Sequence, residues 1–230
     1  MTAPVSALAA LSRREPAFAG IVERFGPPPA WQREPGFSTL LRIVLEQQVS
    51  LASAQAAYDR LCAVVEPLTP GGFLLLDDAR LLTIGFSRQK TRYARALATA
   101  VLDGSLDLDA LAGQDDEQVD AALRTIPGIG PWTATIYRLM ALGRPDAWPA
   151  HDIALAQAVA ELWNRPARPT PEQLLEIAEA WRPWRAIAAK LLWHYYLSTP
   201  REARSVTGPR GVRVVRQKSA RWLRTIWSFA

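Results

Sequence analysis

The sequence predicts an all-α protein. Its 230 residues divide into helix-length segments joined by short connections rich in glycine and proline, and cap residues precede several of these segments. No stretch of the sequence shows four or more clean alternations of apolar and polar residues bounded by turns, so no sheet is expected. Apolar residues make up 49% of the chain and charged residues 21%, which is the composition of a globular protein and excludes a wholly disordered chain.

Cap residues and prolines set the boundaries of the predicted helices. Ser38, Ser50 and Ser87 can accept backbone amides as N-caps. Thr170 is a stronger start signal, because proline follows it and glutamine stands three residues later. The predicted helices cover, in chain order, residues 39–46, 51–65, one short helix within 73–84, 88–102, a helix from Asp115 or Asp116 to about 125, 131–142, 153–163, 171–181 and 184–197.

The chain divides into three parts by composition. Residues 1–37 are expected to hold a separate opening helical element and a stiff break at Gly26-Pro-Pro-Pro29, and residues 38–200 hold the main helical domain. Residues 201–230 contain eight basic residues and one acidic residue, whereas the rest of the chain sums to a net charge of −2. The overall net charge of +5 therefore reflects a basic C-terminal tail. A basic arm often binds along the phosphate backbone of a nucleic acid. A solvated tail without a binding partner is the alternative interpretation.

The cysteine and histidine content excludes several kinds of site. The single cysteine, Cys62, rules out a disulfide framework, a four-cysteine iron–sulfur cluster and any cysteine-based zinc site. His151 and His194 lie far apart in the sequence and leave little for a metal site. No run of about 18 apolar residues could span a membrane, and no basic segment precedes the apolar residues 5–11 as it would in a signal peptide. We therefore expect a soluble intracellular protein.

The most informative segment is Pro127-Gly-Ile-Gly130, which lies between two predicted helices. Two glycines two residues apart allow a sharp backbone turn. The helix that begins at Pro131 would then point its first amides outward, where a phosphate can bind without any reading of base sequence. An ordinary helical hairpin is the alternative interpretation.

Four segments together resemble one family. Ile126–Ala134 resembles the helix-hairpin-helix of the base-excision DNA glycosylase superfamily, and Gly143–Asp152 resembles the segment leading to its catalytic aspartate. Ile43–Ser50 resembles its Gln-x-Val/Leu-Ser segment, and Trp181–Trp193 resembles the closing helix of the 3-methyladenine DNA glycosylase II branch. The segments occur in the family's order. The resemblance implies two helical subdomains with an active-site cleft between them.

Only about 37 residues precede the similar region. We therefore expect this chain to lack the N-terminal α/β domain that the larger bacterial enzymes of the branch carry.

Asp152 falls on the catalytic position that the resemblance implies. Glycosidic cleavage builds positive charge on the sugar, and a fixed carboxylate stabilises that charge and can orient or deprotonate water. From the residues alone, Asp152 is better explained as the N-cap of the helix that begins at Ile153. The two roles are compatible, because a helix N-terminus keeps a carboxylate ionised.

Trp132 stands where relatives that also nick the strand carry a lysine nucleophile, and tryptophan cannot form a Schiff base. The resemblance therefore implies hydrolysis without lyase activity. Trp132 and Trp193 match positions near the base pocket, where aromatic faces suit a positively charged alkylated purine. Both are core residues in the alternative interpretation. His151 is expected as either a pocket residue or a simple turn residue.

The resemblance also implies contacts to DNA. Gln47 and Gln48 lie where relatives insert a wedge side chain, and Gln48 matches best; a polar interhelical turn is the alternative. Residues 87–90 begin a further helix. A solvated face is the simpler expectation for these residues, and contact with the DNA backbone is the alternative. The backbone at the hairpin is expected to bind a phosphate through Gly128, Ile129, Gly130 and Thr133. A monovalent cation, Na⁺ or K⁺, would be held by the carbonyls of Arg124, Ile126 and Ile129.

These observations predict a monofunctional DNA glycosylase that flips an alkylated purine out of duplex DNA and leaves an abasic site. It would need no cofactor, act as a monomer, and work in the bacterial cytoplasm on the nucleoid. A glycosylase that removes hypoxanthine, uracil or 8-oxoguanine is an alternative enzymatic function. A non-catalytic helix-hairpin-helix module that binds DNA, and a helical protein–protein module, are alternatives from other classes.

Overall fold

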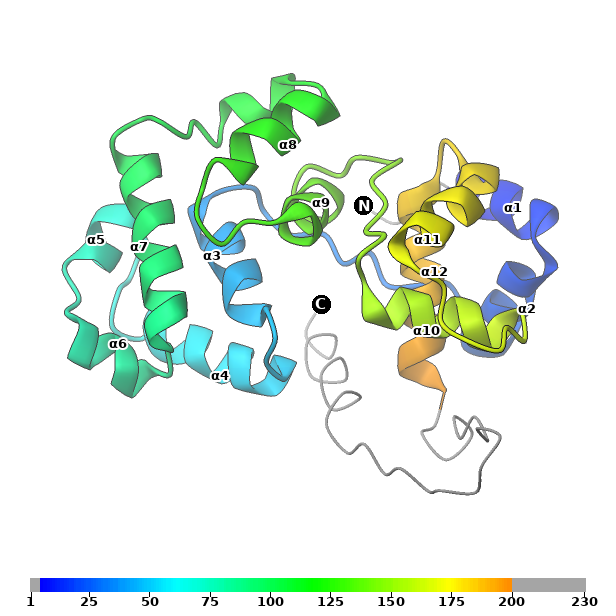
Figure 1. Ribbon diagram of the computed structural model, residues 1–230, viewed down its shortest axis with the longest axis horizontal. Coiled ribbons are helices and arrows are strands. Elements are labelled where there is room, and N and C mark those ends of the chain that lie inside the picture. Colours follow the sequence, from blue (N-terminus) through cyan, green and yellow to red (C-terminus); the bar gives the residue numbers. More distant parts are fainter. Residues whose placement is uncertain (1–4, 200–230) are drawn as a thin grey trace. The chain divides into compact units, whose positions relative to one another are not determined.

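The computed structural model describes residues 5–199 as an all-helical protein (Figure 1). No strand occurs among these residues, so the predicted fold class is confirmed. None of the described helices is long and apolar enough to cross a bilayer. The predicted basic tail, residues 201–230, lies outside the described residues.

The helices follow one another with short connections. In chain order they are α1 (Val5–Arg14), α2 (Pro16–Phe25), α3 (Phe37–Glu46), α4 (Leu51–Cys62), α5 (Pro70–Leu74), α6 (Asp78–Ile84), α7 (Arg88–Leu102), the 3₁₀ turn η1 (Ala110–Gly113), α8 (Asp116–Arg124), α9 (Pro131–Met140), α10 (Ile153–Leu162), α11 (Pro171–Ala178), the 3₁₀ turn η2 (Glu179–Trp181) and α12 (Arg185–Ser198).

The chain forms two compact units, and the first unit is discontinuous in sequence. Among the described residues it contains 5–31 and 145–199, whereas the second contains residues 32–144. The opening helices α1 and α2, expected as a separate element, pack on α12 at the other end of the described chain. Figure 1 shows this pairing as blue helices beside an orange one.

Aromatic side chains fill the core of the first unit. Trp181 is 2% exposed, and its ring lies 5.1 Å from that of Phe18, 5.4 Å from that of Trp148 and 5.9 Å from that of Trp163. Buried aromatic rings of this size contribute strongly to core stability. Several of the nine tryptophans are therefore structural.

Helix α3 is the central element of the second unit, where it packs against α4, α7 and α9. Its predicted burial on nearly all sides is confirmed. Its predicted start is wrong, because Gly36 and not Ser38 is the N-cap. Gly36 has φ 130° and donates its N–H to the Tyr137 hydroxyl at 2.9 Å. Ser38 lies inside the helix, and its hydroxyl pairs with the Tyr58 hydroxyl.

The short helix predicted within residues 73–84 is present as α6, and a second helix, α5, precedes it, because two caps start two separate turns. Thr69 accepts the N–H of Gly72 at 3.1 Å to begin α5, and Asp77 accepts that of Arg80 at 2.7 Å to begin α6. The other predicted caps are confirmed. They are Ser50, Ser87, the Asp115 alternative for α8 and Thr170, the last two with a reciprocal bond from glutamine three residues later.

Candidate functional site

The turn between α8 and α9 places its two glycines in different environments. Gly128 has φ 89°, and a Cβ there would lie 2.2 Å from Cγ of Tyr93, so both conformation and packing require glycine. Gly130 has an ordinary φ of −95°, and a Cβ there would meet nothing within 4 Å. The expectation that both glycines shape the turn is therefore right for Gly128 and wrong for Gly130. The space beside Gly130 is open to a ligand.

The first turn of α9 presents backbone donors at this open position. Gly130 is the N-cap, and the first N–H of the helical ladder is that of Ala134, which donates to the Gly130 carbonyl at 3.0 Å. The N–H groups of Gly130 and Thr133 precede that bond, as expected at any helix start. Ile129, predicted as a phosphate contact, donates its N–H to the Ile126 carbonyl at 3.0 Å. Its amide therefore belongs to the turn.

Gln47 binds the hairpin through its side chain. Its Nε2 donates to the Gly128 carbonyl at 2.9 Å and to the Thr133 hydroxyl at 2.8 Å. Both N–H bonds of this amide are thus directed at the hairpin, and the Thr133 side chain is buried. Gln47 therefore links the turn after α3 to the hairpin, which leaves Gln48 as the candidate for the wedge.

Gln48 is exposed and has φ 55°, a left-handed conformation that costs a non-glycine residue about 1 kcal/mol or more. A second bond fixes the turn that carries it, since Lys90 of α7 donates to the Leu45 carbonyl in the last turn of α3. Burial lowers the pKa of Lys90 to about 8, against the opposing effect of Glu46. The expectation that residues 87–90 form a solvated face is wrong for Lys90, which is half-buried and bonded to the Leu45 carbonyl. No local pattern in the sequence could have indicated its acceptor.

Trp132 is the second residue of α9 and is half-buried, in contrast to the core tryptophans of the first unit. Part of its indole remains accessible.

The carbonyls of Arg124, Ile126 and Ile129, in and after the last turn of α8, are the predicted ligands of a cation. Arg124 is the last residue of α8. Carbonyls in the last turn of a helix receive no N–H from within the helix. Backbone oxygens of this kind fit a hard cation, although the Ile126 carbonyl already accepts the Ile129 N–H.

In the first unit, Asp152 is held at the start of α10. Its Oδ1 accepts the backbone N–H of Leu155 at 3.0 Å and the indole N–H of Trp193 at 3.2 Å. The side chain is half-buried. The predicted cap is therefore present, and the same carboxylate is fixed by a second donor from α12.

Trp193 is 3% exposed, and its ring packs at 64° against that of Trp31 with centroids 6.1 Å apart. The ring is part of the core, as the alternative interpretation held. In this structure it gives Asp152 a hydrogen-bond donor and does not offer an open face to a base. Sequence reasoning missed Trp31, because its contact with α12 joins distant parts of the chain.

His151 precedes Asp152 and is exposed. The pKa of Glu172, at the start of α11, is lowered mainly by its hydrogen bond with Thr170 and to a smaller extent by His151. Among the described residues, no group of three His, Cys, Asp or Glu side chains could hold a metal ion.

The predicted site residues thus form two groups, one in each unit. The first unit holds Asp152, Trp193 and His151, and the second holds the hairpin and the glutamine turn. A family model described as "HhH-GPD superfamily base excision DNA repair protein" matches residues 41–183. The chain belongs to the HhH-GPD superfamily. The match includes the hairpin, both glutamines and Asp152 and ends before Trp193.

Relatives of this HhH-GPD protein include DNA-3-methyladenine glycosylase 2 of Escherichia coli, which is 31% identical over 80% of this chain and 67% of its own. A probable bifunctional transcriptional activator/DNA repair enzyme AlkA of Mycobacterium tuberculosis is 36% identical over 66% of this chain. The chain spans 32% of that relative. The structure of Schizosaccharomyces pombe 3-methyladenine DNA glycosylase Mag1 in complex with abasic DNA has a TM-score of 0.76 and 25% identity, covering 82% of this chain and 95% of Mag1. The predicted resemblance is confirmed.

Proposed function

We propose that this HhH-GPD protein is a monofunctional DNA glycosylase that hydrolyses the N-glycosidic bond of alkylated purines, of the 3-methyladenine and 7-methylguanine type, in duplex DNA. The observation that carries the proposal is the fixed carboxylate of Asp152, with two N–H donors on one oxygen, within the matched family region. The names of the relatives, DNA-3-methyladenine glycosylase among them, supply the substrate class.

Asp152 supplies the charge that the reaction needs. When the glycosidic bond breaks, its electron pair leaves with the base and positive charge develops on the sugar. A carboxylate fixed in position by hydrogen bonds stabilises that charge. Water then adds to the anomeric carbon and gives up a proton, for which Asp152 is the acceptor in this proposal. The product is an abasic site.

The leaving base explains why a strong general acid is not required. An alkylated purine carries a positive charge and departs as a neutral molecule. The partly accessible indole of Trp132 suits such a base, because an aromatic face attracts a cation. Since indole has no amine to form a Schiff base, the reaction ends at hydrolysis without strand cleavage.

The second unit binds the DNA in this proposal. The amides of Gly130 and Thr133 receive a phosphate at the open start of α9. The carbonyls of Arg124, Ile126 and Ile129 would hold a monovalent cation, which would offset phosphate charge. Gln48 fills the gap left by the extruded nucleotide. The protein acts as a monomer on chromosomal DNA in the cytoplasm.

A panel of duplexes, each with one damaged base, tests the substrate class. Wild-type protein is incubated with duplexes that contain 7-methylguanine, 3-methyladenine, hypoxanthine, uracil or 8-oxoguanine, and free base is measured by chromatography. Abasic sites are detected separately by alkali, so that release and strand cleavage are distinguished. We expect release of the methylated purines with intact strands before alkali. Release of uracil or 8-oxoguanine alone would contradict the alkylpurine assignment.

A further inference from the structure

The backbone is strained at Trp31, where the N-terminal part of the first unit ends. This residue has φ 48°, a left-handed conformation that is unfavourable for a side chain other than glycine, and it is 5% exposed. Such strain persists only where the surrounding structure imposes it, and it is concentrated at functional sites. Core packing does not require it, since none of the buried residues Trp148, Trp181 and Trp193 has a positive φ.

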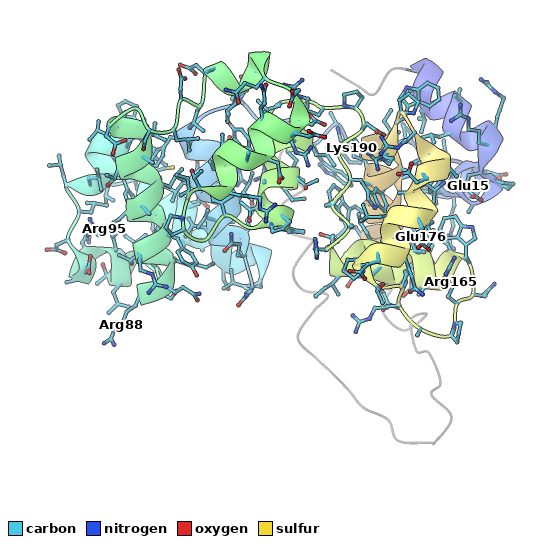
Figure 2. The ribbon with its side chains drawn as sticks, turned by 45° about the horizontal axis from the view of Figure 1, so that its top comes forward. Glu15, Arg88, Arg95, Arg165, Glu176 and Lys190 are labelled. Carbon is cyan, nitrogen blue, oxygen red and sulfur yellow. The ribbon has the colours of Figure 1, made fainter. Side chains whose placement is uncertain are left out.

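Lys190 of α12 holds the backbone directly before Trp31. Its Nζ donates to the Ala30 carbonyl at 2.6 Å. Lys190 is half-buried, and burial lowers its pKa without an opposing effect from any carboxylate of the described residues. Figure 2 shows this lysine on α12, in the first unit. Burying an ammonium group without an acidic partner is costly. Stability therefore does not explain Lys190, whereas fixing of the Ala30 carbonyl gives it a role.

The segment at residues 30 and 31 contacts α12 at two points. Lys190 and Trp193 are three positions apart, so their side chains lie on the same face of the helix. Lys190 binds the Ala30 carbonyl, and the Trp31 ring packs at 64° against that of Trp193, with centroids 6.1 Å apart. The lysine thus fixes the backbone beside the residue whose ring contacts Trp193.

The indole that Trp31 contacts is the one that donates to Asp152. Trp193 Nε1 lies 3.2 Å from Asp152 Oδ1, at the long end of the range for such bonds. Because a hydrogen bond weakens steeply as its angle departs from linear, a small tilt of the indole would break it. Contact with the Trp31 ring restricts that tilt. The other donor, the Leu155 N–H, belongs to the backbone of α10 and does not depend on the rotation of a side chain.

We propose that Trp31 and Lys190 are positioning residues for the reaction at Asp152. Lys190 fixes the backbone at Ala30, the left-handed conformation places the Trp31 ring against Trp193, and this ring holds the Trp193 N–H on the carboxylate. Neither residue touches the reacting atoms. The inference rests on the proposed function, since it assigns both residues to the same chemistry.

A double-variant cycle separates positioning from general packing. Trp31→Leu is made in wild-type protein and in Trp193→Phe, which has no indole N–H to orient. Single-turnover release of 7-methylguanine is measured at saturating protein. We expect Trp31→Leu to slow release about 10-fold in wild type and less than about twofold in Trp193→Phe, because residues that act through one another are not additive. An equal loss in both backgrounds, or no loss in wild type, would overturn the positioning role.

Trp163→Leu is the matched control. Trp163 belongs to the same unit, and its ring packs on those of Phe18 and Trp181. It follows the last residue of α10, which is about 15 Å along the helix from the end that Asp152 caps. Base release by the folded control should stay within about twofold of wild type. A loss as large as that of Trp31→Leu would show that any damage to the core slows the reaction, and would overturn the inference.

Lys190→Met tests the second residue against a purely structural role. Methionine fills similar space and lacks the donor to the Ala30 carbonyl. Base release should slow by about three- to tenfold, the effect of one hydrogen bond. The melting temperature should stay within a few degrees of wild type, because the lost bond is offset by removal of a buried charge. Release at the wild-type rate, or a loss that only accompanies unfolding, would overturn the role of Lys190.

Exchange of the Trp193 indole N–H with solvent tests the geometry without any activity. Its NMR signal is identified by its absence from Trp193→Phe. We expect exchange roughly 10-fold faster in Trp31→Leu, because the bond to Asp152 is weakened, and an unchanged rate in Trp163→Leu. Exchange at the wild-type rate in Trp31→Leu would overturn the positioning role. Faster exchange in Trp31→Leu together with no base release by wild type would support the positioning of the indole and contradict the proposed glycosylase.

Discussion

Replacing each hairpin glycine by alanine separates folding of the hairpin from binding of DNA. At Gly128 the change forces a left-handed alanine, which costs about 1–2 kcal/mol, and brings the new Cβ to 2.2 Å from the Tyr93 ring. Displacing a packed ring costs a further 1–3 kcal/mol or so. At Gly130 the backbone is ordinary and the surroundings are open, so only about 0.5–1 kcal/mol is lost from a weaker N-cap.

The two variants should therefore behave in opposite ways. For a protein of this size about 1 kcal/mol corresponds to roughly 2–4 °C, so Gly128→Ala should lower the melting temperature by about 4 °C or more and Gly130→Ala by less. For duplex binding by the folded proteins the order of the two effects reverses, and Gly130→Ala should lose more affinity than Gly128→Ala. A methyl group at residue 130 obstructs a phosphate at the start of α9. The loss of a charge-assisted bond there, about 1.5–3 kcal/mol, predicts roughly 10- to 100-fold weaker duplex binding.

Melting and anisotropy titrations on the same preparations are sufficient to test this. Wild-type affinity in a folded Gly130→Ala protein would refute the assignment of the phosphate to this helix start. An unchanged melting temperature in Gly128→Ala would refute the argument that Tyr93 and the left-handed backbone require glycine.

Two further predictions concern single side chains. Trp193→Phe removes the N–H bonded to Asp152 and retains a ring against Trp31, so single-turnover base release should fall about 10- to 100-fold while duplex affinity stays within about twofold; a parallel loss of affinity would indicate a general structural role. Because burial lowers the pKa of Lys90 from 10.5 to about 8, the unfolded state binds more protons between these values, and the free energy of unfolding should gain a favourable contribution as pH rises from about 8 to 10.5. Lys90→Met should lack that contribution in denaturant titrations across this range, and identical pH slopes for the two proteins would contradict it.

Local signals predicted most of the helix boundaries correctly. Ser50, Ser87 and Thr170 cap the helices expected of them, because N-capping depends on residues only three positions apart. Gly36 and Ser38 show where this reasoning fails. The N–H of Gly36 donates to the Tyr137 hydroxyl, about a hundred residues away. With Gly36 as the N-cap, the helix starts two residues earlier than predicted.

The candidate site shows the same division. Asp152 is identifiable from its segment, and its capping bond to Leu155 follows from local sequence. Its second donor, Trp193, and the ring of Trp31 depend on how α12 packs, which no short pattern encodes. Gln47 is predicted as a DNA contact because its segment resembles that of the family. Its side-chain bonds to the hairpin, more than 80 residues away, could not be predicted from that segment.

The most direct test of the catalytic assignment compares wild type with Asp152→Asn on a duplex that contains a single 7-methylguanine. Asparagine keeps the size of the side chain and an oxygen for the N–H groups of Leu155 and Trp193, so the fold should be retained. Single-turnover release of the base is measured after binding of both proteins has been shown to saturate. The proposed mechanism predicts duplex binding within about threefold of wild type and base release slower by about 100-fold or more, the loss typical of a group that stabilises transition-state charge. Release at the wild-type rate by the asparagine variant would show that the Asp152 carboxylate does not perform the chemistry.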